Sequence, residues 1–464
     1  MPCQPGTSGP IPERDGSPHT RSTLHVTLAS VFGSVIEWYD FFLYATMAAL
    51  VFNTEFFPSS SPLVGTLVAF GTFAAGFVTR PIGGLLFGHF GDRLGRKRML
   101  VVTMLITGGS TFVMGLLPTY ATIGAAAPIV LLALRMLQGI GLGGEWGGAG
   151  LLTYEHAPAG RAGWLSSWPQ TGVPIGLLLS TLAVRGAGAF GDQVLIDWAW
   201  RLPFLASIVL VGVGLFVRLR VSEPPAFSSV LADQKQAKLP MAEVVRHYPR
   251  VTLIGMGARF SESITFNVFN AFVLTYTTEV LGMPREIPLN GLLVAAAIGF
   301  VVIPLSGWLS DRIGRGAVFA IGVVISGASA FPAFAMIDSL DPALVWLGIL
   351  LGWSLGACTM FGPEAALFAE LFPTRVRYTG ISIVYQLGVL PSGAIAPALC
   401  TALVVHFGGQ SWPVATYVAV FAALAIVALV LRRRLPDGGV ADTSTPPHVS
   451  AHTAGSTTDR ASRQ

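Results

Sequence analysis

Two carboxylates, Glu37 and Asp40, lie three residues apart within a long, mostly apolar stretch near the start of the chain. On a helix this spacing places both side chains on one face. Two neighbouring carboxylates repel each other when both are ionised, so the pair favours retaining a proton. A carboxylate that loads and releases a proton can couple proton movement to transport. We therefore take both as the leading proton-coupling candidates, the alternative being a polar edge to the stretch; further candidates are Glu145 and Glu364.

Three arginines, Arg80, Arg135 and Arg259, also fall inside apolar stretches. A charge at the centre of a bilayer costs about 2.5–3.5 kcal/mol on insertion scales, so such side chains face the protein interior. A guanidinium is permanently charged, and its planar fork matches a carboxylate. Arg80 could therefore bind a substrate carboxylate or form a structural ion pair with Glu37 or Asp40.

One apolar stretch carries a polar stripe of three residues, Arg135, Gln138 and Glu145. At 100° per residue they fall within an arc of about 80°, which fits the wall of a cavity. The glycines between them, residues 139–144, formally match the GxGxxG pattern of nucleotide-binding loops. No strand precedes them, so we interpret them as a site of close helix packing.

A further pair, Arg259 and Glu262, can form an ion pair along one helix face, either as scaffold or as lining of a substrate site. Gln170 and Gln386 occupy matched positions in the two halves of the chain. The substrate-binding candidates are Arg80, Arg135, Gln138, Gln170, Arg259, Glu262 and Gln386.

A charged loop occurs twice, as residues 88–97 and 307–316, with Asp92 and Asp311 about 219 residues apart. A second stretch, residues 155–172, matches residues 370–388 in residue type at nearly the same offset. Six predicted spans separate the copies, and six is even, so both halves run in the same direction. This predicts two bundles related by an axis along the membrane normal.

The repeated stretches carry acids and bases at the cytosolic ends of the predicted spans. Cross-pairing between the halves would hold the cytosolic face shut, and breaking it would open that face. The alternative is that the arginines only fix the topology. The gate candidates are Asp92, Arg93, Arg96, Glu155, Arg161, Asp311, Arg312, Arg315, Glu370, Arg375 and Arg377.

The elements that position these residues are membrane-spanning helices. The 464 residues are 52% apolar and only 11% charged, against roughly 25% charged residues in soluble proteins. Mean hydropathy is +0.65. We predict an all-α membrane protein with twelve transmembrane helices in two six-helix bundles, each helix of about 20 or more residues. The expected spans are 25–52, 63–90, 98–117, 127–153, 163–185, 200–220, 251–281, 288–310, 316–337, 342–369, 377–406 and 411–433.

Positive charges orient this topology. With both termini in the cytosol, 22 of the 28 Lys and Arg residues lie on the cytosolic side, Arg218 among them, and three lie outside. The net charge of +4 thus reflects topology, and nucleic-acid binding is not expected. The expected division is 1–22 as a disordered cytosolic tail, 23–220 as the first bundle, 221–250 as a cytosolic linker, 251–435 as the second bundle and 436–464 as a disordered cytosolic tail.

Other classes of function find little support. Cys3, Cys358 and Cys400 form no metal-binding or disulfide pattern, and the first residues lack a cleavable signal. There is no nucleophile–base constellation or phosphate loop. We expect neither an enzyme nor a cofactor or metal; the expected partners are a small-molecule substrate, protons and the lipid bilayer, with the protein a monomer.

The chain resembles the major facilitator superfamily over about residues 25–434, and within it the metabolite:proton symporter group. The resemblance rests on the sequences at residues 37–42, 80–84, 91–97, 143–145, 198–204 and 370–380. It implies proton-driven uptake by alternating access, but not the substrate, because the group includes shikimate, α-ketoglutarate, citrate and proline/betaine permeases. The Arg259/Glu262 pair departs from the shikimate-permease-like pattern.

These patterns predict a proton-coupled symporter in the plasma membrane that imports a small organic metabolite, favouring a carboxylate. One alternative is a drug-type proton antiporter, which the span at 163–185 disfavours because it lacks the Gly-Pro-x-x-Gly-Gly ending of the antiporter motif. A second is a membrane receptor that binds ligand without transport, which would normally need an added cytosolic domain.

Overall fold

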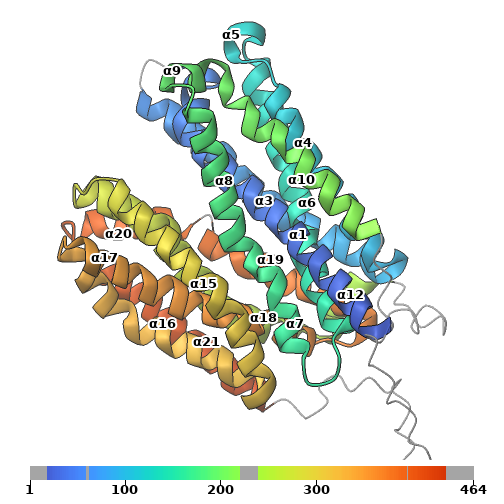
Figure 1. Ribbon diagram of the computed structural model, residues 1–464. Helices are drawn as coiled ribbons and strands as arrows, with labels where there is room; N and C mark the ends of the chain where they lie inside the picture. The colour runs from blue at the N-terminus through green and yellow to red at the C-terminus, as the bar shows by residue number, and fades with distance from the viewer. Residues whose placement is uncertain (1–17, 59–61, 220–238, 394, 435–464) are drawn as a thin grey trace, which may run out of the picture.

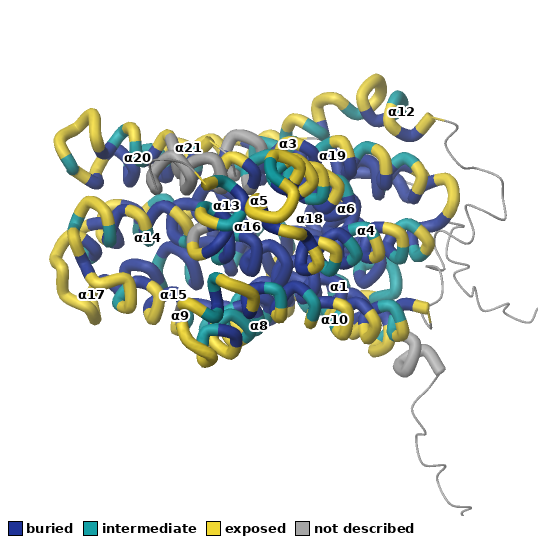
Figure 2. The backbone as a smooth tube through the Cα atoms, turned by 90° about the horizontal axis from the view of Figure 1, so that it is seen from above, coloured by how far each residue is buried: buried dark blue, intermediate teal, exposed yellow. Residues whose placement is uncertain are grey.

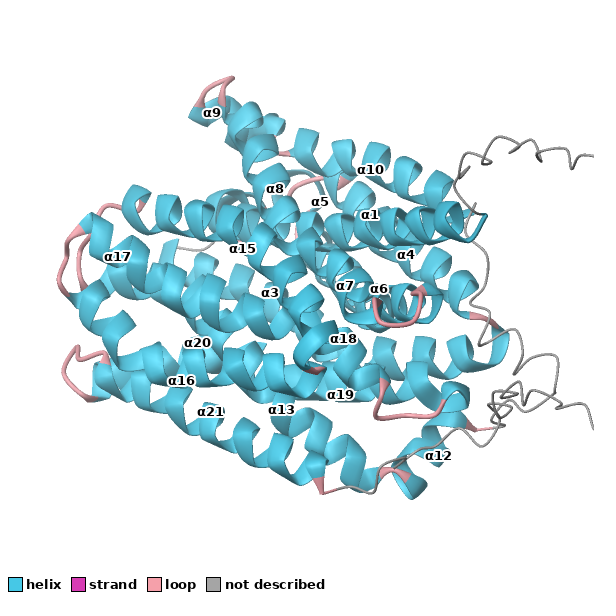
Figure 3. Cartoon of the chain, turned by 60° about the horizontal axis from the view of Figure 1, so that its bottom comes forward, coloured by secondary structure: helices cyan, strands magenta, loops and turns pink. Residues whose placement is uncertain are grey.

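The computed structural model describes residues 18–58, 62–219, 239–393 and 395–434, and no strand occurs within them. Long helices joined by short loops make up this part of the chain (Figure 3). The expected tails, except for residues 18–22, and most of the expected linker lie outside the described residues. α1 already begins at Pro18, inside the expected tail, and the last part of the expected linker forms a short helix, α12 (Pro240–His247).

The first half of the chain forms six long helices with short helical pieces at their ends. α7 (Ala162–Ser167) leads through the tight turn η2 (Trp168–Thr171) into α8, so these three form one span. The long helices are α1 (Pro18–Met47), α3 (Pro62–Leu94), α4 (Arg96–Leu116), α6 (Ala126–His156), α8 (Gly172–Gly188) and α10 (Arg201–Leu219). The short pieces are η1 (Ala48–Phe52), α2 (Asn53–Glu55), α5 (Tyr120–Ile123), α9 (Asp192–Val194) and η3 (Leu195–Ala199).

The second half repeats this order. Its first span continues from α13 through η4 (Val268–Phe272), α14 (Val273–Thr275) and η5 (Tyr276–Val280), and its fourth is built from α17, η6 and α18. The principal helices are α13 (Pro249–Asn267), α15 (Glu286–Ile313), α16 (Arg315–Asp338), α17 (Pro342–Ile349), η6 (Leu350–Ala357), α18 (Cys358–Ala369), α19 (Arg377–Gly393), α20 (Ala396–His406) and α21 (Trp412–Arg433).

Within the described residues, nine helical runs are long and apolar enough to cross a membrane. Three further runs, at 62–94, 249–280 and 377–406, correspond to the remaining expected spans, the last of them containing a residue that is not described. Large apolar side chains on the outer faces are exposed, while the middle of the molecule is buried (Figure 2). Exposing so much apolar surface to water would be unfavourable. In a bilayer it is favourable, because helices satisfy their backbone hydrogen bonds internally.

The repeated loop produces the same sharp turn in both halves. Gly95 separates α3 from α4 with φ of 112°, and Gly314 separates α15 from α16 with φ of 97°. This conformation is open to glycine because it lacks a Cβ atom. Each turn places the preceding aspartate, Asp92 or Asp311, in the last turn of a long helix.

The two halves meet where α3 and α6 pack against α19 and where α7 and α8 pack against α15. α18 also packs against α6 and α7. In Figure 1 the helices of the two halves spread apart toward α9 and α20 and come together toward α7 and α12. Aromatic contacts join the halves in the middle, including Trp38 of α1 against Phe266 of α13, with ring centroids 5.5 Å apart.

Candidate transport site and the two latches

Asp92, in the last turn of α3, caps a helix of the opposite half. Its carboxylate accepts hydrogen bonds from the backbone N–H groups of Tyr378 (3.3 Å) and Thr379 (2.9 Å), in the first turn of α19, and from the Thr379 hydroxyl (2.8 Å). A carboxylate at a helix N-terminus satisfies free N–H groups and interacts favourably with the helix dipole. We call this contact the first latch.

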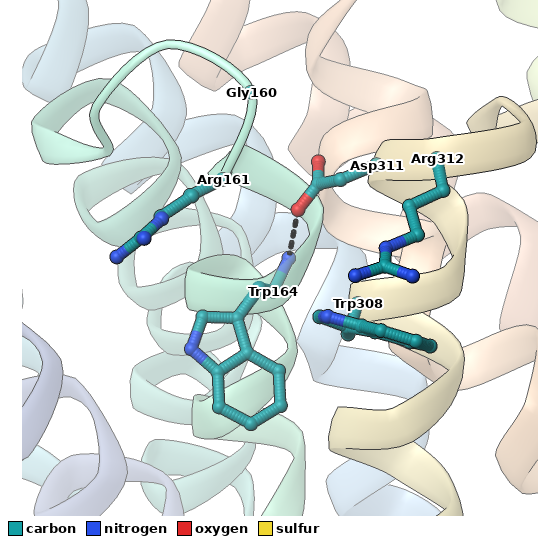
Figure 4. Close-up of a pocket in the computed structure, with 6 residues that line it drawn as sticks. All are labelled: Gly160, Arg161, Trp164, Trp308, Asp311 and Arg312. Carbon is teal, nitrogen blue, oxygen red and sulfur yellow. Dashed lines mark hydrogen bonds between the residues drawn. The ribbon is translucent and has the colours of Figure 1, made fainter.

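Asp311 makes the matching contact from the second half. Its carboxylate accepts hydrogen bonds from the backbone N–H groups of Gly163 and Trp164, both at 2.8 Å, in the first turn of α7. Figure 4 shows the bond to Trp164. We call this contact the second latch, and the end of the molecule that holds both latches the charged end.

Glycines allow the helices to approach closely at both latches. A Cβ atom on Gly307 would lie 2.7 Å from the carbonyl oxygen of Gly163. A Cβ atom on Gly88, the matching residue, would lie 2.9 Å from the Cα atom of Thr379. The repeated motif thus begins with a glycine because a larger residue would separate the two halves.

At the first latch, one ion pair lies within the first half and a second joins the two halves. Arg96 pairs with Glu155, lies 3.7 Å from Asp92 and donates a hydrogen bond to the carbonyl oxygen of Thr374 (2.9 Å). Arg377, from the second half, also pairs with Glu155 at 2.9 Å. These side chains, except Arg377, are buried. The cross-pairing expected between the halves therefore occurs here.

The ion pairs at the second latch stay within one half. Arg315 pairs with Glu370 and lies 3.8 Å from Asp311, and Arg432 pairs with Glu370 at 2.9 Å. Arg161, which matches Arg377 in sequence, forms no ion pair with any described residue.

The other arginines expected at the gate also behave differently. Arg375 pairs at 2.7 Å with Glu243 of α12 instead of bridging the bundles. Burial lowers the pKa of Arg375, but Glu243 and Tyr248 together outweigh burial, so the net shift of the pKa is upward. Arg93 is exposed and forms no ion pair within the described ranges. The Arg312 guanidinium lies 3.8 Å from the centre of the Trp308 ring.

A pocket of about 280 Å³ lies beside the second latch. In Figure 4, Arg161 extends away from Asp311, while Arg312 lies over Trp308. The pocket is lined by Gly160, Arg161, Trp164, Trp308, Asp311 and Arg312.

Arg80, on α3, is a buried cation that no acid neutralises directly. Only 5% of the residue is exposed, and it forms no ion pair or hydrogen bond with any residue that the structure describes. Its guanidinium lies over two aromatic rings, 4.7 Å from the centre of Phe77 and 5.4 Å from that of Phe41. The ion pair with Glu37 or Asp40 that the sequence allowed is not formed.

Glu37 and Asp40, on α1, are both buried. Both carboxylate oxygens of Asp40 are buried and receive no hydrogen bond from a described residue. The same holds for Glu37 Oε2. An ionised carboxylate in such a place is costly unless a cation, a donor or a proton accompanies it. The pair therefore lies where a proton-binding group is expected.

The polar stripe of α6 is divided between two internal contacts. Arg135 bonds to Gln138, whose amide donates to Thr111 Oγ1 at 2.7 Å, and its guanidinium lies 4.3 Å from the centre of the Tyr44 ring. This part of the stripe links α1, α4 and α6.

Glu145, the third member of the stripe, is paired inside the first half. It accepts a hydrogen bond from Thr103 (2.7 Å) and pairs with Arg218 of α10, which also donates to the Leu100 carbonyl oxygen at 2.6 Å. The Arg218 side chain is buried, and the sequence analysis did not single it out as a partner of Glu145. Its place in the last turn of an apolar run gave no signal of this contact.

Arg259, on α13, lies between two buried carboxylates. It pairs with Glu262 on its own helix and with Glu364 of α18, at 3.0 Å. Its guanidinium lies 4.0 Å from the centre of the Tyr385 ring on α19. The sequence predicted the first pairing but not that Glu364 joins it.

A stack of two aromatic rings crosses between the halves next to these charges. The rings of Trp146 and Tyr385 lie 3.5 Å apart at an interplanar angle of 14°. Trp146 Nε1 donates to Gln170 at 2.9 Å, and Gln386 Nε2 donates to the carbonyl oxygen of Gly143 at 2.9 Å. The two matched glutamines therefore support this crossing point, which sequence reasoning did not find because ring stacking between distant helices leaves no local pattern.

Two helical halves in the same order, joined by two matched latches around buried charges, define a multi-pass membrane transporter. The sequence matches the Major Facilitator Superfamily profile over residues 30–388 and 293–456. The chain belongs to this superfamily, whose fold has twelve transmembrane helices.

Named relatives are transporters rather than enzymes. The shikimate transporter of Escherichia coli is 42% identical over 394 residues, covering 84% of this chain and 90% of the relative. An inner membrane metabolite transport protein of the same organism is 42% identical over 420 residues, covering 88% and 93%. A solved structure of a proton:xylose symporter, 19% identical, covers 89% of this chain and 96% of that chain with a TM-score of 0.72, which shows the shared fold.

Proposed function

We propose that the protein is a proton-coupled symporter that imports a small organic carboxylate across the plasma membrane by alternating access. The charged end faces the cytosol in this proposal, as the distribution of Lys and Arg favours. The described conformation, with both latches made, is then closed on the cytosolic side.

Arg80 is the observation that supports a carboxylate substrate. A buried guanidinium without an anion is costly, and a substrate carboxylate would supply the missing charge and bidentate hydrogen bonds. The rings of Phe41 and Phe77 lie beside this guanidinium. A relative at 42% identity is named a shikimate transporter, and shikimate carries a carboxylate.

Arg80→Gln tests this assignment. We expect substrate binding to weaken by at least about tenfold, since a hydrogen bond to a charged group contributes about 1.5–3 kcal/mol. The matched control is Arg185→Gln, which removes an exposed arginine that forms no ion pair with a described residue. Thermal-shift titration of the purified variants with shikimate-like acids, dicarboxylates and betaines measures binding. Equal affinity of the Arg80→Gln variant and the control would reject the role of Arg80.

Proton coupling is assigned first to Glu37 and Asp40. Uptake into proteoliposomes should rise when the outside is made acidic, and Glu37→Gln or Asp40→Asn should reduce that dependence. The control is counterflow of labelled substrate at equal pH on both sides, which requires no net proton movement. Uptake by the unmodified protein that ignores an imposed pH gradient would refute the coupling.

A further inference from the structure

Two carboxylates of the second half share one arginine. Glu262 Oε2 and Glu364 Oε1 both contact the same guanidinium nitrogen, Nη1 of Arg259. All three side chains are buried. We call Arg259, Glu262 and Glu364 the shared-arginine cluster.

The remaining oxygens of this cluster are unpartnered. Glu262 Oε1 and Glu364 Oε2 are buried and receive no hydrogen bond from any residue in the described ranges. A buried acceptor without a donor is costly, and two ionised carboxylates this close repel each other. A proton on one of them would remove the repulsion and add an O–H donor.

The surroundings supply no second cation that pairs with either carboxylate. From α19 the Tyr385 ring faces the Arg259 guanidinium, and from α3 Arg80 interacts with Arg259 through space. No other described Lys, Arg or His forms an ion pair with Glu262 or Glu364. With both carboxylates ionised, the three side chains of the cluster would carry a net charge of −1.

We propose that the shared-arginine cluster binds one proton, held by Glu262 and Glu364 together, and is a second proton-carrying site of the transport cycle. Loading places the proton on a carboxylate oxygen and leaves a neutral cluster. Release returns the proton to water and leaves Arg259 facing two anions. This rests on the proposed symport, but the protonation itself can be tested without it.

A single buried pair in the first half provides a matched comparison. Glu145 faces one arginine, Arg218, so that pair is neutral without a proton. Glu364→Gln leaves a neutral Arg259–Glu262 pair, whereas Glu145→Gln leaves Arg218 without its carboxylate. We expect the midpoint of thermal unfolding to fall for Glu145→Gln and to stay equal or rise for Glu364→Gln. An equal fall in both variants would overturn the proposal.

Infrared spectroscopy detects the proton directly. The unmodified protein should show a carbonyl stretching band of a protonated carboxyl group that shifts in D2O, and Glu364→Gln should remove one such component. The Glu37→Gln, Asp40→Asn double variant should retain that component, which separates this cluster from the first half. If the component survives Glu364→Gln and Glu262→Gln alike, the cluster is ionised and the proposal fails.

Transport then shows whether the proton is used. Glu364→Gln should retain counterflow but lose much of its stimulation by an inward pH gradient, and Glu364→Asp should restore part of it. Wild-type stimulation of the Glu364→Gln variant would make the cluster a scaffold, while the symport proposed from Glu37 and Asp40 would stand. Stabilisation by sodium ions at constant pH, with no infrared component, would instead assign the site to a metal cation and reject the proton.

Discussion

The two latches are copies of one motif, but their surroundings differ. In both, an aspartate caps a helix of the other half. The two residues capped at the first latch follow the two capped at the second by the same number of residues. At the first latch Glu155 accepts an arginine from each half. At the second, Glu370 accepts two arginines from its own half. Duplication has kept the capping hydrogen bonds and one ion pair, Arg96–Glu155 in the first half and Arg315–Glu370 in the second, but not the second arginine on each glutamate.

From this difference we infer that the first latch is the stronger one. It is buried, and it adds a cross-half ion pair to the capping bonds. The second latch has the capping bonds but no cross-half ion pair among the described residues, and its arginine at the matching position, Arg161, is exposed beside a pocket. We infer that opening of the charged end begins at the second latch, between α7 and α15.

Loss of the capping charge should have the largest effect. Asp92→Asn removes the charge from three hydrogen bonds, each worth about 1.5–3 kcal/mol when charged, so we expect uptake to fall by tenfold or more. Asp311→Asn, with two such bonds, should have the smaller effect. Initial uptake rates, divided by the amount of inserted protein, compare the variants. Normal uptake by well-inserted Asp92→Asn protein would show that the first latch does not hold the gate.

The matched arginines give the next largest difference. Arg377→Gln removes a cross-half pair and should weaken the first latch by about 1–2 kcal/mol, between the values for exposed and buried pairs. Arg161→Gln removes no pair and should change stability by less than about 0.5 kcal/mol.

Two buried serines at matched positions report on the latches separately. Ser166 lies on α7 and Ser382 on α19. In a cysteine-free background, Ser166→Cys and Ser382→Cys should react with a thiol reagent only when the charged end opens. Arg377→Gln should increase labelling at 382, and Arg161→Gln should leave both rates unchanged. Equal increases in both variants would contradict the inferred asymmetry.

The sequence was sufficient for the features that repeat locally. Apolar length and the matched motifs predicted twelve spans and the placement of Asp92 and Asp311 at helix ends. The reason is physical: a bilayer demands long apolar helices, and a sharp glycine turn recurs wherever its motif does.

The ion-pair partners of the arginines could not be predicted from the sequence in the same way. Arg80 had two acids available in the sequence and pairs with neither, while Arg218 pairs with Glu145 across two helices. Arg432 of α21, far from Glu370 along the chain, forms an ion pair with the Glu370 carboxylate. These outcomes depend on how each helix is rotated and how closely it packs, which local residue patterns do not specify.

Raising the salt concentration should also distinguish the two latches, but with a smaller effect than mutation. The screening length falls from about 10 Å at 0.1 M to about 3 Å at 1 M, and exposed pairs are affected most. At the second latch, the capping Asp311 and the Arg315 beside it are 6% and 18% exposed, against 0% for both Asp92 and Arg96 at the first. Raising salt across this range should increase labelling at 166 more than at 382. A larger increase in labelling at 382 would mean that the first latch is the weaker one.

Substitution of Tyr154 should have the smallest effect on the latches, and the effect should be similar at both. This side chain of α6 lies near one arginine of each latch, with its ring centre 5.5 Å from Arg315 and 5.7 Å from Arg377. Contacts of this kind contribute about 0.5–1 kcal/mol when partly exposed. Tyr154→Leu should therefore raise labelling at 166 and 382 together by less than about fivefold, and Tyr154→Phe, which keeps the ring, should not. A rise at 382 alone would mean that the ring supports only the first latch and that the two latches open independently.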